Sequence, residues 1–292
     1  MTVQPEGVFY DMSFEDYLSA DAVSCSDLCT LLESFPARLL HKKPSTQALE
    51  EGRIAHRLVL EGVDDLDNSS AYVVVPKGFS MAHVKVHADL IERITVTGAT
   101  PISEDRAQMI RDMHKALRAD SAVMSALSNG HPEVSVFWRE EKHGLLCRAR
   151  FDFVPNKGLL FGDYKTAASI DPGPLSRSIA NFKVAHRSAW YQRAAIHGLG
   201  RNDPSRPPLY MPIWQEKTPP HFVVMRPCED QDIELAGREL DQALAIYAYC
   251  KESGVWPGPK HFTRIALPAW ERRRLEDTFG GEAADSEWSD AA

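Results

Sequence analysis

Asp152, Asp163 and Lys165 are the residues whose types and spacing most readily support chemistry. Asp163 and Lys165 lie two positions apart in the apolar run 159–165, which predicts a strand with both side chains on one face and Tyr164 on the other. Asp152 stands near the end of the preceding predicted strand, and the tight turn between the strands can bring it beside Asp163. Neighbouring carboxylates form a hard oxygen site for Mg²⁺ or Mn²⁺. A lysine beside them can orient a water and stabilise charge developing on a phosphate.

The same residues have a simpler interpretation, a salt bridge between Asp163 and Lys165 on an exposed strand. The segment 159–161 before the pair is Leu-Leu-Phe, which is typical of a central strand. Charged side chains on such a strand are costly unless they are paired or functional. The context therefore favours a functional site over a salt bridge alone.

The elements that must position these residues follow from apolar periodicity and capping signals. Ser24 with Asp27 forms a capping box at the start of a helix, and Pro36 begins a second, short helix. We predict further helices at Thr46–Glu61, Ala82–Thr95, Glu104–Ala119, Ser121–Leu127, Ala185–Leu199 and Glu229–Ser253. We predict strands at Ala71–Val75, Glu133–Arg139, Leu145–Val154, Leu159–Lys165, Leu209–Gln215 and His221–Arg226. This order predicts one α/β or α+β domain whose strands share one sheet.

Asp152 followed by Asp163-x-Lys165 on adjacent strands resembles the PD-(D/E)xK nuclease superfamily. Within it, the chain resembles the RecE-type (exodeoxyribonuclease VIII-like) exonucleases of phages and prophages, from about Tyr10 to about Trp256. The supporting motifs, in chain order, are Val23-Ser-Cys-Ser-Asp-Leu28, Ser34-Phe-Pro-Ala37, Glu51-Gly-Arg-Ile-Ala-His56, Glu133-Val-Ser-Val-Phe-Trp138, Arg148-Ala-Arg-Phe-Asp152, Asp163-Tyr-Lys-Thr166 and Ala189-Trp-Tyr191. The resemblance implies a PD-(D/E)xK core, with a central mixed β-sheet flanked by helices.

The resemblance also implies roles for the site residues. Asp152 and Asp163 would hold the metal, supported by His56 and Glu133, and Lys165 would position or activate the attacking water. A helical histidine such as His56 is more often a core or surface residue, and an acid at a strand start is unremarkable, so these alternatives stay open.

The helix that follows the metal strands in relatives carries a glutamine and then a tyrosine four positions on. Tyr191 fits the tyrosine, and Arg187 stands where the glutamine is expected. Arginine can bind phosphate but cannot accept a hydrogen bond, which weakens the assignment of Arg187 more than that of Tyr191. Arg53 and Arg57 flank His56 and are candidates for contacts with the DNA backbone, or else solvated helix arginines.

The function implied by the resemblance is a metal-dependent 5′-to-3′ exonuclease of double-stranded DNA that leaves 3′ single strands for recombination. It would use Mg²⁺, with Mn²⁺ as a substitute, form a ring-shaped homo-oligomer around DNA, and pass the strand to an annealing protein of the RecT type. Two alternatives are an endonuclease or single-strand nuclease of the same superfamily, and an inactive DNA-binding or assembly module.

Composition and charge are compatible with this expectation. The 292 residues are 43% hydrophobic and 25% charged, which excludes disorder over most of the chain. No run of about 18 apolar residues indicates a membrane span, and the acidic start is unlike a signal peptide, so we expect a cytoplasmic protein.

The formal net charge of −8 by itself argues against a DNA partner, but the acidic residues are concentrated at the two ends of the chain. Residues 1–21 hold five acids and residues 276–292 hold six, and neither end holds a base, which leaves 33 basic and 30 acidic residues in 22–275. We expect an acidic lead-in at 1–21, a nuclease domain at 22–256, and a C-terminal extension at 257–292 with a mobile acidic tail that is dispensable for cutting. The mildly basic body suits a nuclease that holds DNA in a channel.

Overall fold

The computed structural model describes residues 6–41, 72–83, 85–260 and 264–279. The chain divides into two compact units, Met1–Pro257 and Gly258–Ala292, and each is described by itself. The predicted helix Thr46–Glu61 and the acidic tail beyond Phe279 lie outside the described residues.

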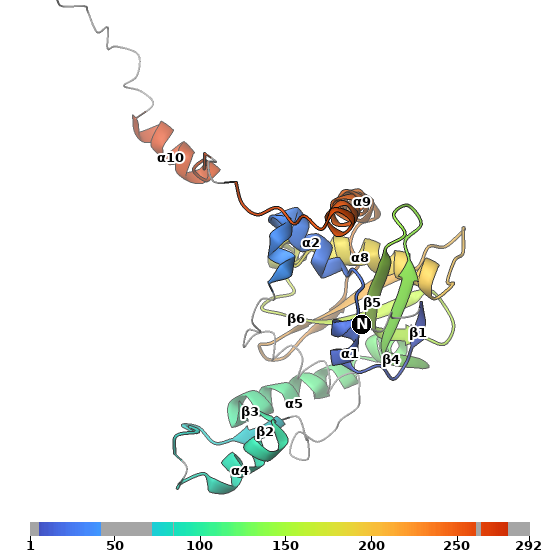
Figure 1. Ribbon diagram of the computed structural model, residues 1–292. Helices are drawn as coiled ribbons and strands as arrows, with labels where there is room; N and C mark the ends of the chain where they lie inside the picture. The colour runs from blue at the N-terminus through green and yellow to red at the C-terminus, as the bar shows by residue number, and fades with distance from the viewer. Residues whose placement is uncertain (1–5, 42–71, 84, 261–263, 280–292) are drawn as a thin grey trace, which may run out of the picture. The chain divides into compact units, whose positions relative to one another are not determined.

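The described strands of the first unit form three hydrogen-bonded sheets (Figure 1). An antiparallel sheet has the order β1 (Gly7–Phe9), β4 (Gly130–Arg139), β5 (Leu146–Pro155). A mixed sheet consists of β6 (Leu160–Ala167), which is parallel to β7 (Leu209–Glu216), and β8 (Val223–Met225), which is antiparallel to β7. A parallel pair joins β2 (Tyr72–Val75) and β3 (Thr100–Ser103).

The described strands form three ladders, so they do not all share one ladder as expected. Strands β5 and β6 meet without a ladder among the described residues, and there the backbone N–H of Tyr164 donates to Oδ2 of Asp152 at 2.8 Å. The junction of the two sheets is also where the predicted acids lie.

Helices pack on these sheets through their apolar stripes. The largest core joins α2 (Cys25–Glu33), α8 (Val184–Arg193) and α9 (Asp230–Ser253) to the alternate residues of β4 and β5 that face them. A smaller core joins α5 (Glu104–Ala119) and α6 (Ser121–Ala126) to Tyr164 and Ile213 of the mixed sheet. β6 therefore has Tyr164 in one core and Phe161 in the other, as expected of a central strand.

Local signals located several helix ends correctly. Ser24 and Asp27 form both hydrogen bonds of the predicted capping box, and Asp120 caps α6. Pro36 begins the short helix η1 (Pro36–Leu40). The predicted helix at 82–95 begins later, as α4 (Ala88–Thr97), and the predicted helix at 185–199 ends in the π-helical turn η2 (Ala194–Gly198). Strand β3 and helix α7 (Pro172–Asn181) were not predicted, because a short strand and a Pro-rich helix start give weak periodicity.

The acidic lead-in is part of the fold. Strand β1 pairs with β4, and α1 (Phe14–Ser19) buries Tyr17 against Phe137. Arg148 of β5 holds this segment, because its Nη1 donates to the carbonyls of Tyr17, Leu18 and Ala20 at 2.6, 3.1 and 3.0 Å. Local composition marked residues 1–21 as acidic but gave no sign of this attachment.

The turn η2 passes unusually close to β4. A Cβ added to Gly198 would lie 2.3 Å from Cγ1 of Val136, a fully buried side chain with no room to move. We expect Gly198→Ala to lower the free energy of unfolding by about 1–3 kcal/mol, as overpacking does. Urea denaturation measures this.

Gly237→Ala is the matched control for that substitution. Its added Cβ would lie no closer than 3.5 Å to any neighbour, and alanine is the better helix former within α9. Its stability should be unchanged or raised, by up to about 1 kcal/mol. Equal losses from both substitutions would contradict the close approach at Gly198.

The second unit contains α10 (Ala269–Phe279), where Arg274 and Glu271 form an ion pair at 2.6 Å and no residue is buried. This helix was not predicted. Among the described residues of the chain, no helix is long and apolar enough to cross a membrane.

Candidate active site

Asp163 and Lys165 form an ion pair on one face of β6. Their side chains retain 6% and 18% of their exposure, so the pair is largely removed from water. Tyr164 points to the opposite face, where its hydroxyl donates to Oε1 of Gln215 at 2.6 Å. The alternation of side chains along the strand predicted this orientation. Because both charged side chains are largely buried, the pair is not the exposed salt bridge of the simpler interpretation.

Asp152 lies beside this pair. Its hydrogen bond from the backbone N–H of Tyr164 fixes one carboxylate oxygen next to the residue that follows Asp163. A charged acceptor on a backbone N–H is a strong hydrogen bond, so the position of Asp152 is well defined. The structure therefore brings together Asp152, Asp163 and Lys165.

Tyr191 of α8 closes the site from the helix side. Its hydroxyl donates to the carbonyl of Arg150 at 2.7 Å, two residues before Asp152. Its ring packs edge-on against Phe151, with the ring centroids 4.9 Å apart. Burial, followed by the charges of neighbours that include Asp163 and Asp152, raises the pKa of Tyr191 well above its usual value. Tyr191 is thus a protonated donor that holds β5 in place.

Arg187 lies one helical turn before Tyr191. Burial alone would lower the pKa of Arg187, but the electrostatic influence of Tyr210, Cys25, Tyr191 and Asp163 outweighs it, and the net shift is upward. The guanidinium therefore stays charged beside the acids. A fixed positive charge there can attract a phosphate, which the glutamine expected at this position cannot do.

Glu133 forms an ion pair with Arg150 of the neighbouring strand. It lies in β4 with a φ of 56°, and the pairs Pro132–Phe153 and Val134–Phe151 on either side of it place it opposite Asp152 in the ladder. Its Oε2 accepts from Nε of Arg150 at 2.7 Å. Among the described residues, no three His, Cys, Asp or Glu side chains form a group that could hold a metal, and the supporting role of Glu133 at the metal stays a prediction. His56, Arg53 and Arg57 lie outside the described residues.

The donor set at the junction fits a small hard cation. Mg²⁺ is commonly held by one or two carboxylates, with waters and substrate phosphates completing its shell. Asp152 and Asp163 supply two carboxylates, and Oδ2 of Asp163 is buried and makes no hydrogen bond with another described group apart from its ion pair with Lys165. Such an oxygen suits a cation that arrives with the substrate.

One residue of this site, Tyr210 of β7, was not predicted from the sequence. It is 2% exposed, and its ring centroid lies 5.0 Å from that of Tyr191. No local signal marks it, because its place beside Asp163 depends on the register between β6 and β7. Strand β7 was predicted only to complete the sheet.

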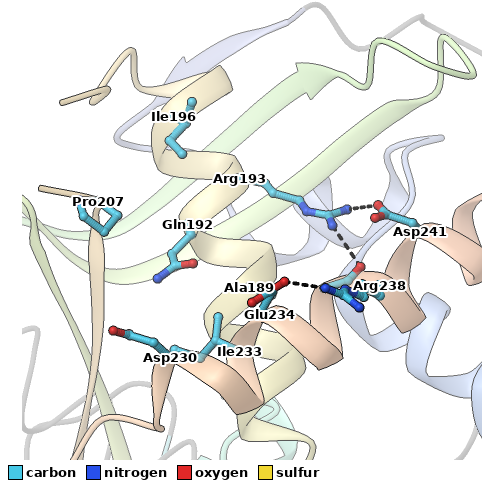
Figure 2. Close-up of a pocket in the computed structure, with 11 residues that line it drawn as sticks. Ala189, Gln192, Arg193, Ile196, Pro207, Asp230, Ile233, Glu234, Arg238 and Asp241 are labelled. Atoms are coloured by element: carbon cyan, nitrogen blue, oxygen red, sulfur yellow. Dashed lines mark hydrogen bonds and ion pairs between the residues drawn. The ribbon is translucent and has the colours of Figure 1, made fainter. Parts of the chain in front are cut away.

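A surface pocket of about 540 Å³ lies elsewhere, between α8 and α9 (Figure 2). Four of its charged side chains pair with one another: Arg193 contacts Asp241 at 2.7 Å and donates to the carbonyl of Gly237, and Arg238 contacts Glu234 (Figure 2). No residue of the predicted site lines it.

Comparison with known proteins places this geometry in context. Residues 26–261 match the family described as "PDDEXK-like domain of unknown function (DUF3799)". The solved structure of a "Putative exonuclease" from Eubacterium rectale is 14% identical, with 94% of this chain and 99% of that chain covered and a TM-score of 0.59, which shows a shared fold. A second solved protein, 13% identical over 70% of this chain and 96% of its own, has a TM-score of 0.26 and carries no argument. No curated protein matches the chain.

Proposed function

We propose that this chain, which belongs to the family of PDDEXK-like domains of unknown function (DUF3799), is a divalent-metal-dependent nuclease that degrades double-stranded DNA from an end. One observation carries the proposal. The hydrogen bond from Tyr164 N–H to Asp152 gathers two carboxylates and Lys165 at a single strand junction, although Asp152 lies on a different strand. That donor set serves phosphodiester hydrolysis directly.

Each residue of the site has its own role in hydrolysis. Bound at Asp152 and Asp163, a Mg²⁺ ion would supply charge stabilisation for the attacking and leaving oxygens. Lys165 orients the attacking water and offsets negative charge on the phosphate. Arg187 attracts the phosphate, and Tyr191 keeps β5 at the spacing that Asp152 needs.

The finer parts of the proposal concern polarity, assembly and partner. We propose digestion of the 5′-ended strand, which leaves a 3′ single strand for an annealing protein of the RecT type, by a ring-shaped homo-oligomer. The resemblance of the ordered motifs to RecE-type exonucleases supports this, and so does the fold shared with a protein described as a putative exonuclease.

Three DNA substrates test the proposal, each incubated with Mg²⁺, with Mn²⁺ and with EDTA. We expect a 5′-labelled linear duplex to release its label early, a 3′-labelled duplex to shorten while it keeps its label, and a closed circular duplex to survive. Cutting of the circle would point instead to an endonuclease. Binding of DNA without cutting under either metal would point to a non-catalytic module. Light scattering during size-exclusion chromatography measures the subunit number, and a monomer would contradict the ring.

A further inference from the structure

Tyr210 projects from the same face of the mixed sheet as Asp163. In the parallel ladder of β6 and β7, Phe161 pairs with Tyr210 and Asp163 pairs with Pro212. Paired residues of a ladder share a face, and the pair next along that face lies within reach of a long aromatic side chain. Tyr210 is therefore the diagonal neighbour of Asp163.

The hydroxyl of Tyr210 is buried without a hydrogen-bond partner among the described residues. Its ring is held by Tyr191 and by an apolar cluster that includes Val184 and Trp214, so the side chain has little freedom to seek a partner elsewhere. Leaving a buried donor unpaired costs about 1–3 kcal/mol, and native proteins keep few such groups. The nearby Oδ2 of Asp163 is also buried, and it forms an ion pair with the ammonium of Lys165.

The charges around Tyr210 define what its hydroxyl can do. Burial raises its pKa well above the usual value, with further upward influence from Asp163 and Tyr191 and an opposing influence from Arg187. The phenol therefore stays protonated and remains a hydrogen-bond donor at neutral pH. The influence of Asp163 is the largest of those from neighbouring charges, which agrees with the diagonal placement of the two residues.

We propose that Tyr210 is a positioning residue of the nuclease site, whose hydroxyl, through a water shared with the Asp163 carboxylate, fixes the orientation in which Asp163 receives the divalent cation. The inference rests on the proposed function and deepens it. One water between the Tyr210 hydroxyl and the Asp163 carboxylate satisfies the buried hydroxyl and adds a hydrogen bond to the carboxylate. Groups that orient a metal ligand from behind typically contribute 10–100-fold to metal affinity or activity.

Tyr210→Phe tests the proposal, because it removes the hydroxyl and keeps the ring that packs on Tyr191. Mn²⁺ affinity, measured by calorimetry or by the loss of the free-ion electron paramagnetic resonance signal, should fall about 10-fold. The kcat on linear duplex DNA should fall by a similar factor with the KM for DNA unchanged. The melting temperature without metal should stay the same or rise, since the variant loses an unpaired buried donor.

Tyr247→Phe is the matched control, since Tyr247 of α9 packs against Trp256, away from the acids. It should leave Mn²⁺ affinity and kcat at wild-type values. Wild-type Mn²⁺ affinity in Tyr210→Phe would overturn the proposal, as would a wild type that binds no Mn²⁺. A wild type that binds Mn²⁺ but cuts no DNA would overturn the proposed function, while a 10-fold loss of Mn²⁺ affinity in Tyr210→Phe would still support the role of Tyr210.

Discussion

Replacing Asp163 with asparagine should reduce metal-dependent degradation of linear duplex DNA by at least about 100-fold. Loss of a group that only orients a metal ligand costs about 10–100-fold in activity, and loss of the ligand itself should cost more. Asparagine keeps the shape of the side chain but loses the negative charge that the cation and Lys165 share. Release of nucleotides from end-labelled DNA, compared at saturating Mg²⁺ for both proteins, measures the effect.

Stability measurements on variants of the Asp163–Lys165 pair separate an effect on catalysis from an effect on folding. Lys165→Met leaves the buried carboxylate of Asp163 without its partner and should cost about 3 kcal/mol in EDTA. The double variant Asp163→Asn, Lys165→Met removes both charges and should recover most of that loss. It should stay inactive.

The interpretation of the pair as a structural salt bridge predicts a different pattern. Activity would then follow stability, and the double variant would cut DNA as the wild type does. Full activity in Asp163→Asn alone would show that the site lies elsewhere.

Replacing Arg148 with methionine should lower the free energy of unfolding by about 3 kcal/mol, because three carbonyls at the end of α1 lose a buried charged donor. The guanidinium is also 3.8 Å from Asp27 and lies over the ring of Tyr17 at 5.1 Å. For a protein of this size the melting temperature should fall by about 6–10 °C. Chymotrypsin should cut the N-terminal segment at lower enzyme concentrations than in the wild type.

Arg139→Met is the control for this prediction. Arg139 lies on the neighbouring strand β4 and also contacts the N-terminal segment, through Glu6 at 3.0 Å, but half of its side chain is exposed. An exposed pair contributes at most about 1 kcal/mol, so this variant should unfold almost as the wild type does. Similar losses from both substitutions would show that the segment is held by its surface charges and not by Arg148.

The sequence by itself determined the local part of this protein. The capping box of Ser24 and Asp27, the bounds of α5 and the common face of Asp163 and Lys165 all follow from residues within a few positions of one another. Such features depend on helix and strand periodicity, which the chain sets without distant contacts. The ordered motifs pointed to the PD-(D/E)xK fold class, which the family match and the shared fold confirm.

Only the tertiary structure decided which residues from distant segments meet. Three contacts depend on the register between strands: the bond of Glu133 to Arg150, the hydrogen bond of Asp152 with Tyr164, and the diagonal placement of Tyr210 beside Asp163. The attachment of residues 12–20 to Arg148 and Arg150 depends likewise on contacts more than 120 positions apart. Register is set by the packing of side chains from the whole core, and a slip of one residue would turn each of these groups to the other face, so no local pattern could specify them.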